Sequence, residues 1–388
     1  MRSLRVYSTL ALLTGGAAGS CTIDRSPDSD PLISIEDGVE VATPPAIPAP
    51  FDPRYEWEFR ALREIPAGGP GPGHDPLVFN PARALPLRNG TLLVHDPQAD
   101  APLVILDPTQ RSALYRFGRN GQGPGELSPL VDLSENPDGS LRVLARANRQ
   151  VLTYGPDGTY LGSERLEFEE YPFKSLPAPD TEGHFVEVGT RGPGAWVRRV
   201  ARVELDPPRL LPGVELAEPA PGARGTGIQY GRALWSVVGE HLVTMRSENP
   251  TVTVHDLSGN LVREIRLPLS RRTLSESDIQ EQISLHGPIA RSLEPGPAAL
   301  TNELYAASDS VFGMLMSALW RAAEDPRSFP DELWWRLFSL HGRYIGMVRV
   351  PEDVNWLWQG SDRFWAFSVT ADGEPVIQEL MLRRKMVE

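Results

Sequence analysis

Cysteine and lysine are nearly absent from this sequence of 388 residues. Cys21 is the single cysteine, which excludes an intrachain disulfide. Lys174 and Lys385 are the only lysines, so arginine carries almost all the positive charge. The formal net charge is −13, which disfavours a nucleic-acid partner because binding to nucleic acid requires a basic surface.

The motifs of common catalytic centres are missing as well. The chain has seven histidines, but no His-x-x-x-His pair or cysteine cluster supports a zinc site. No Gly-x-Ser-x-Gly elbow and no reactive cysteine supports nucleophilic catalysis. The sequence therefore predicts no cofactor. It leaves open a calcium-like divalent metal held by carboxylates and asparagine.

The N-terminus has the layout of a secretory signal over residues 1–20. Two arginines precede an apolar stretch at 6–13, which is too short to span a membrane, and small residues follow. Cys21 directly follows these small residues, which resembles a bacterial lipobox except that the pattern prefers leucine at the position of Ala18. The resemblance implies lipidation of Cys21. The alternative is an ordinary signal peptide followed by a chance cysteine.

Residues 21–54 are rich in proline, aspartate and serine, and we expect a lipidated cysteine followed by a disordered tether. Several acyl chains on one cysteine would anchor the protein stably to a membrane. Thr22 stands where an aspartate would follow the cysteine in some lipoproteins. By resemblance to known lipoprotein sorting, this favours the outer membrane.

One β-rich pattern recurs six times after a turn residue, with starts 49, 44, 57, 70 and 52 residues apart. The six runs are 91–96, 140–145, 184–189, 241–246, 311–316 and 363–368. A four-residue turn follows each of the first five runs, at 107–110, 155–158, 206–209, 256–259 and 339–342. A sixth turn lies at 370–373. Their Asp, Pro and Gly residues are typical of β-turns. A spacing of this size indicates a propeller.

We therefore predict an all-β fold over residues 55–388: a six-bladed β-propeller of four-stranded antiparallel blades, in which each run is the inner strand. The last blade lacks an outer strand, and we expect segment 55–65 to supply it and close the ring. A β-sandwich or two β domains is the alternative, which the even spacing over such a length disfavours.

A glycine-rich stretch at 116–127 is the sharpest local motif. It has no Gly-Lys-Ser/Thr ending and no following helix, so it does not match a phosphate-binding loop. We expect a crossing between blades, where glycines permit sharp turns. The alternative is a ligand-facing role for four polar side chains: Arg116, Arg119, Gln122 and Glu126.

This stretch, the following Asp138-Gly-Ser-Leu-Arg-Val segment and the turn at 155–158 together resemble the bacterial six-bladed β-propeller lipoproteins related to NHL repeats. The best match covers 102–166, and a weaker blade pattern covers about 55–388. The resemblance implies an exported, NHL-like propeller. It implies no established reaction and transfers no catalytic residue.

Segment 271–299 interrupts the regular spacing. Thr273 and Glu276 have the spacing of a capping box, and Ile279 and Ile283 lie one helical turn apart. The pattern predicts a short helical insertion on one end of the propeller. It is either a lid over the central funnel or a decoration packed on the barrel end.

Two further features are candidate sites. His95 and Asp96 end the first β-rich run, and Asp96 is expected to cap a turn, with a metal or acid–base role as the alternative. Trp356 and Trp358 alternate, so on an extended strand both rings share one face and are the best candidates for partner binding. The alternative is that these rings fill space between blades.

The sequence favours a non-catalytic binding or scaffold module, anchored in a membrane and monomeric, for an unidentified protein, peptide or carbohydrate. The alternative function is a metal-dependent hydrolase or lactonase with a site in the central funnel. Its candidate carboxylates are spread along the chain: Glu126, Asp132, Glu187 and Asp362.

Overall fold

The computed structural model describes most of the chain after residue 29. The described residues are 30–45, 47, 53–68, 77–121, 123, 125–127, 130–145, 149–166, 171–177, 183–191, 196–205, 208–216, 233–269, 273–277, 279–280, 284, 296–297, 300–316, 333–351, 354–360, 362–370 and 372–385. The predicted signal peptide, Cys21 and Gln122 lie outside them.

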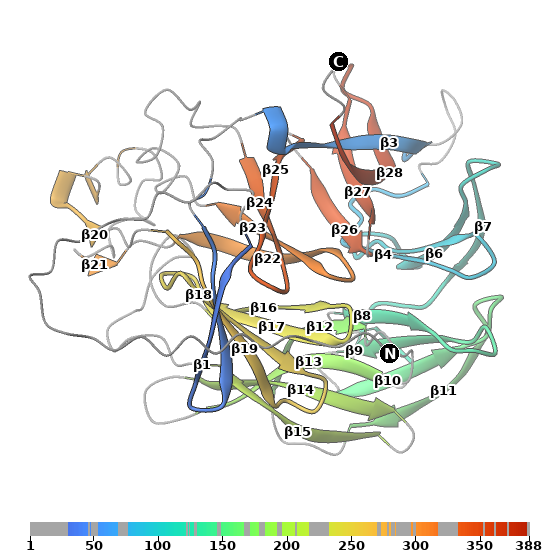
Figure 1. Cartoon of the computed structure of the whole chain (residues 1–388). Helices are drawn as coiled ribbons and strands as arrows, with labels where there is room; N and C mark the ends of the chain where they lie inside the picture. Colours follow the sequence, from blue (N-terminus) through green and yellow to red (C-terminus); the bar gives the residue numbers. More distant parts are fainter. Residues whose placement is uncertain are drawn as a thin grey trace, which may run out of the picture.

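The fold is all-β, with small antiparallel sheets in a propeller-like arrangement (Figure 1). Three sheets each contain four consecutive strands. The first is β4 (Arg83–Pro86), β5 (Leu92–His95), β6 (Leu103–Asp107) and β7 (Ser112–Phe117). The second is β8 (Leu130–Glu135), β9 (Leu141–Ala145), β10 (Gln150–Tyr154) and β11 (Tyr160–Arg165). The third is β12 (Tyr171–Pro177), β13 (Gly183–Arg191), β14 (Trp196–Leu205) and β15 (Pro208–Leu216).

Two sheets are larger. The fourth unit is β16 (Ala233–Val238), β17 (His241–Arg246), β18 (Thr251–Asp256) and β19 (Leu261–Arg266), extended to six strands by β2 (Val39–Thr43) and β1 (Leu32–Glu36). An eight-stranded sheet begins with β22 (Thr301–Ser308), β23 (Val311–Met316), β24 (Leu333–Ser339) and β25 (Tyr344–Val350). It continues through β3 (Glu56–Pro66), β28 (Pro375–Arg384), β27 (Arg363–Val369) and β26 (Asn355–Gln359). A short 3-10 helix, η1 (Pro53–Tyr55), precedes β3.

The predicted count of six blades is wrong when blades are counted as separate hydrogen-bonded sheets. Four blades stand as separate sheets, whereas the strands of the last two units form one eight-stranded sheet. The reason is β3, which pairs antiparallel with β28 along nearly its whole length and also pairs parallel with β25 at Glu56 and Trp57. The expected pairing of segment 55–65 with the last strand is thus observed.

Each β-rich run was expected to be the inner strand of its blade, but each is the second strand of its unit. These strands are β5, β9, β13, β17, β23 and β27. The first strands contact one another in the order β4, β8, β12, β16, β22, β26, and β26 contacts β4. Apolar clusters lie between neighbouring sheets. Leu93 and Ile105 of the first sheet, for example, share a buried cluster with Val143 of the second.

The turns at the predicted positions follow their local chemistry. In the turn at 155–158, Gly158 has φ of +83°, a left-handed conformation that glycine adopts without strain. Asp157 accepts hydrogen bonds from the backbone N–H and the hydroxyl of Thr159. These contacts are local, which is why the turn can be predicted from its residues alone.

The helical insertion predicted at 271–299 is wrong. Among the described residues of this segment, two pairs form a ribbon, β20 (Thr273–Leu274) with β21 (Gly296–Pro297), and only residues 276–277, 279–280 and 284 are helical. Thr273 therefore lies in a strand rather than at a helix cap. The Ile279 N–H donates a helical i to i−4 hydrogen bond to the Ser275 carbonyl. Within the described part of the chain, no helix has the length and apolarity needed to cross a bilayer.

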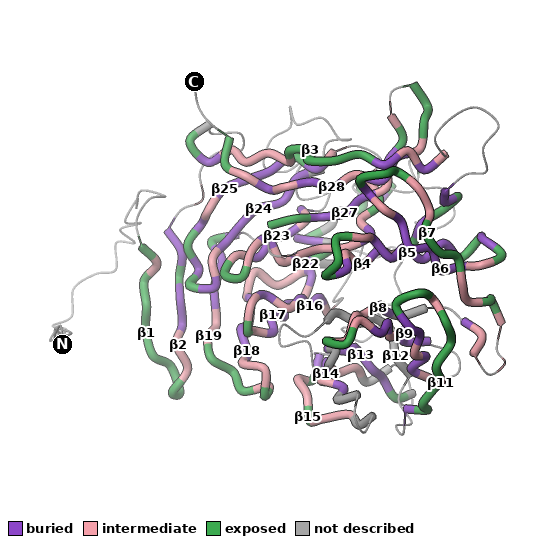
Figure 2. The backbone as a smooth tube through the Cα atoms, turned by 90° about the vertical axis from the view of Figure 1, so that its right-hand side faces the viewer, coloured by how far each residue is buried: buried purple, intermediate pink, exposed green. Residues whose placement is uncertain are grey.

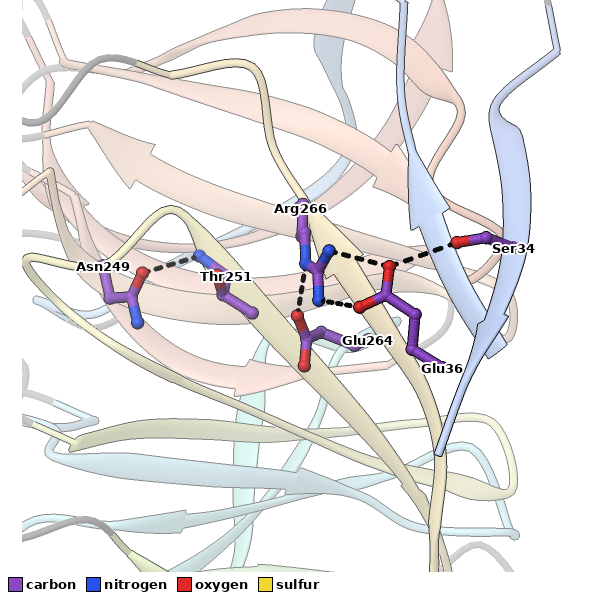
Figure 3. A network of polar contacts seen from close by, with 6 residues as sticks. All are labelled: Ser34, Glu36, Asn249, Thr251, Glu264 and Arg266. Atoms are coloured by element: carbon purple, nitrogen blue, oxygen red, sulfur yellow. Dashed lines mark hydrogen bonds and ion pairs between the residues drawn. The ribbon is translucent and has the colours of Figure 1, made fainter. Parts of the chain in front are cut away.

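Part of the segment expected to be a tether is an ordered β-hairpin. Asp37 and Gly38 connect β1 to β2 with φ of +50° and +83°, the signature of a type I′ turn. β2 then pairs parallel with β19. Figure 3 shows that Arg266 of β19 binds Glu36 through two guanidinium nitrogens, at 2.7 and 3.0 Å, and also contacts Glu264. The hydrogen bond from Arg266 lowers the pKa of Glu36.

Candidate functional site

The charged side chains described in the glycine-rich loop all have polar partners. Arg116 donates to the Leu77 carbonyl at 2.9 Å. Glu126 accepts the Gly123 N–H at 2.9 Å and forms an ion pair with Arg119 at 3.2 Å. Its carboxylate occupies the space that a side chain at Gly121 would need. The structure therefore brings Arg119 and Glu126 together, with Arg116 directed toward a different segment.

Asp96 is a buried carboxylate that connects two segments through hydrogen bonds. Its side chain is fully buried and accepts backbone N–H groups of Phe79, Asn80 and Gln98. The bond to Gln98 is the turn cap that the sequence predicts, and the bonds to Phe79 and Asn80 add a long-range tie to the segment before β4. These donors occupy the carboxylate from both sides.

His95 is buried on β5, directly across from Arg83 on β4. Burial, together with the positive charge of Arg83, lowers the pKa of His95 to about 4, although the charge of Asp96 opposes this shift. The imidazole is therefore neutral at physiological pH.

Trp356 and Trp358 do not share one face, contrary to the expectation. The pairing of β26 with β27 shifts register between these two residues, so that Trp356 lies opposite Ala366 and Trp358 opposite Trp365. This bulge at Leu357 breaks the strict alternation of the strand. Both rings are half-buried in two different apolar clusters, one between the last two units and one beside the first.

The described residues leave a pocket of about 340 Å³ at the point where β3 separates from β25. β3 contributes Glu56, Trp57, Glu58 and Phe59 in sequence. The opposite wall is the end of β25 and the residue after it, with one further residue after β28: Arg349, Val350, Pro351 and Lys385. The pocket exists because β3 pairs with β25 at only two positions before it continues alone with β28.

Charges of both signs and two aromatic rings line this pocket. Lys385 forms an ion pair with Glu56 at 3.0 Å, and Arg383 donates to Glu58 at 2.7 Å. Trp57 is oriented by a 3.3 Å hydrogen bond from its indole N–H to the Ile345 carbonyl. These contacts hold the polar groups of the pocket in place before any ligand arrives.

The pocket floor is continuous with the tryptophan cluster near the C-terminus. The Phe59 ring lies 5.2 Å from the rings of Trp335 and Trp356, and 5.4 Å from that of Phe364. Edge-to-face and tilted contacts of this kind restrict ring motion. Trp356 thus packs against Phe59, a residue of the pocket wall, and does not form an exposed patch of its own.

The candidate carboxylates are placed apart from one another. Glu187 binds Arg198 at 2.9 Å and the Trp235 indole N–H at 2.9 Å, and Glu126 is held by Arg119. Asp132 is buried on β8, and Asp362 is exposed before β27. Among the residues described, no three His, Cys, Asp or Glu side chains gather in a metal-binding group.

Sequence reasoning identified segment 55–65 as a closing strand but did not identify its pocket. A signal was present in Glu56-Trp57-Glu58-Phe59, where acidic and aromatic residues alternate at the start of that strand. The partners on β25 and after β28 could not be inferred, because they lie nearly 300 residues or more away in the sequence.

Fold and pocket together define a propeller-like all-β protein with a ligand-sized cavity that is lined by aromatic rings and charged side chains. No family model and no curated protein matches the sequence.

Several solved structures are similar in shape. A candidate exported protein of Bacteroides fragilis has 12% identity and a TM-score of 0.47, with 86% of this chain and 99% of that chain covered. A DUF4221-family member from Bacteroides vulgatus has 12% identity and a TM-score of 0.47, with 85% and 99% covered. The PQQ-bound aldose sugar dehydrogenase of Streptomyces coelicolor has 13% identity and a TM-score of 0.44, with 87% and 100% covered. At TM-scores below 0.5, these likenesses assign the chain to no family and carry no functional conclusion.

Proposed function

We propose that this protein is an exported, lipid-anchored propeller of six four-stranded units that binds a ligand without transforming it. The closed series of contacts among β4, β8, β12, β16, β22 and β26 supports six units, two of which share one sheet through β3. The signal-like N-terminus and the lipobox-like residues before Cys21 support export and anchoring, with the outer membrane as the proposed destination.

The observation that carries the binding role is the pocket between β3 and β25. Its volume of about 340 Å³ is within the range of small-ligand sites. Trp57 and Phe59 offer ring faces, while Arg349 and Lys385 stand beside two glutamates. This lining fits a ligand with a flat apolar part and polar groups of either sign, such as a peptide or carbohydrate fragment.

The test is a binding screen of the full chain against oligopeptides and oligosaccharides, followed by calorimetric titration. Arg349→Glu reverses a charge in the pocket. Arg343→Glu is the control, because it makes the same change in the connection between β24 and β25, outside the pocket. We expect Arg349→Glu to weaken binding by about tenfold or more and Arg343→Glu to leave it unchanged. Equal binding by both variants would place the ligand elsewhere.

Two further observations separate binding from catalysis. Mass spectrometry of the ligand after incubation is expected to show no new product. Dialysis against a chelator is expected to leave the affinity unchanged, because the pocket uses rings and charged side chains. A product, or a metal present in stoichiometric amount, would favour the hydrolase instead.

Anchoring is tested through Cys21. Cells fed an alkyne-labelled fatty acid are expected to label the protein, and Cys21→Ser is expected to abolish both the label and the membrane association. An unlabelled protein that is nevertheless exported would indicate an ordinary signal peptide. Separation of the two membranes on a density gradient tests the outer-membrane assignment.

A further inference from the structure

β1 is an open edge strand with an unusual number of exposed apolar side chains. It is the outermost strand of the six-stranded sheet and pairs with β2 on one side (Figures 1 and 2). All five of its residues are exposed (Figure 2). Leu32, Ile33 and Ile35 remain 54%, 51% and 68% exposed. An exposed apolar edge of this kind is a template for adding another strand.

The type I′ turn determines which backbone groups of β1 face outward. In a two-residue hairpin the residues that flank the turn, here Glu36 and Val39, form a hydrogen-bonded pair. Hydrogen-bonded positions alternate, so Glu36, Ser34 and Leu32 direct their backbone groups toward β2. The N–H and carbonyl groups of Ile33 and Ile35 therefore point away from the sheet.

We propose that β1 pairs antiparallel with β1 of a second copy of this chain, centred on Ser34. This register places Ile33 opposite Ile35 of the second copy, and the reverse pair follows by symmetry. Each such pair exchanges two backbone hydrogen bonds, and Ser34 faces its own equivalent in the pair between them. The five residues of β1 read Leu-Ile-Ser-Ile-Glu, and their Ile-Ser-Ile centre matches itself when reversed.

Charge supports the same register. Glu36 of one copy lies opposite Leu32 of the other, so no carboxylate faces another carboxylate across the new pair. Glu36 is already held by Arg266 and Ser34 within its own chain, as Figure 3 shows. The charged groups on this face of the sheet are therefore satisfied without the second copy.

The opposite face of the sheet continues the core outward. Ile265 of β19 lies beside Ala42 of β2, and Ala42 lies beside Ile33. The first two are completely buried in one apolar cluster, whereas Ile33 is half exposed. The second copy would extend this apolar row by its own Ile35. Self-pairing would therefore cover the exposed side chain of Ile33, where this row reaches the open edge of the sheet.

The strength of the association follows from its size. A strand of five residues buries less than the roughly 1,200 Å² typical of stable interfaces, so we expect a weak, concentration-dependent dimer. This dimer departs from the monomer expected from the sequence. The edge shares no residue with the pocket, so the two proposals can fail separately.

The register is tested by cross-linking the full chain in a Cys21→Ser background. Directly opposed residues in a pair without hydrogen bonds have Cα atoms about 4.5 Å apart, which suits a disulfide. Ser34→Cys is therefore expected to form a covalent dimer on mild oxidation with diamide. Leu32→Cys is the matched control and should remain monomeric, because it faces Glu36 instead of its own equivalent.

Sedimentation velocity over a range of concentrations tests the association itself. Ile35→Pro removes an outward N–H without removing a bond to β2, and it should raise the dissociation constant by about tenfold or more. Leu161→Lys is the control, since Leu161 is 61% exposed on the open edge of β11, and it should have no effect.

Two results would overturn the proposal. One is a wild-type chain that stays monomeric at all concentrations while Ser34→Cys cross-links no faster than Leu32→Cys. The other is a wild-type dimer that Ile35→Pro leaves intact, with circular dichroism showing a folded variant.

Discussion

At the scale of single residues, Asp96 is the clearest case in which one side chain connects distant parts of the chain. Replacing it by alanine removes a fully buried carboxylate and leaves the part-buried backbone N–H groups of Phe79 and Asn80 without their acceptor. We expect Asp96→Ala to lower the free energy of unfolding by about 3 kcal/mol, measured by urea denaturation. Asp157→Ala, in an exposed turn, should have a much smaller effect, and equal losses would contradict this role for Asp96.

His95 makes a prediction about pH. Its pKa is about 4 in the folded chain against about 6.5 for an ordinary histidine, so protons bind the unfolded chain more tightly. Its contribution to stability is therefore complete above pH 6.5 and is lost as the pH falls toward 4. The loss is at most about 3 kcal/mol.

The measurement is urea denaturation at pH 7 and at pH 4.5, for the wild type and for His95→Gln. Carboxylates titrate in the same range, so the informative quantity is the difference between the two proteins. We expect the variant to lose less stability on acidification than the wild type. Parallel losses would show that His95 is charged in the fold.

At the scale of elements, the β1–β2 hairpin depends on the conformation of its turn. Gly38 has φ of +83°, which a β-branched residue adopts only with strain. Gly38→Val is therefore expected to speed hydrogen exchange of the amides from 32 to 43 while the amides of β16–β19 stay protected. Gly68→Val, in a turn where a Cβ would meet only a Glu374 carboxylate oxygen at 4.0 Å, is the control. Faster exchange across the whole sheet would contradict a separable hairpin.

At the scale of the whole molecule, β3 links the two units of the eight-stranded sheet. Ile65 is completely buried and pairs with Ile377 of β28, whereas Leu62 on the same strand is 40% exposed. Ile65→Ala should lower the free energy of unfolding by about 2–4 kcal/mol, and Leu62→Ala by less than about 1 kcal/mol.

The urea transition of Ile65→Ala should stay single, because β3 pairs with β25 on one side and β28 on the other and so couples the two units. Two separate transitions would show instead that the last unit unfolds by itself. Removing the hairpin alone, through deletion of residues 1–45, should leave a single transition at a lower urea concentration, because Ile265 loses its contact with the buried Ala42.

The sequence alone determined the all-β class, the positions of the recurring strands and the turns between them, because alternation and turn chemistry act over a few residues. It also contained the Asp37-Gly38 turn signal of the hairpin. The high proline and aspartate content of residues 21–54 favoured a disordered tether instead. Only the tertiary structure decided that β2 joins β19, that a bulge separates Trp356 from Trp358, and that β3 merges two units beside a pocket. These outcomes depend on contacts between segments far apart in the chain, where many pairings satisfy the same local pattern and packing selects one.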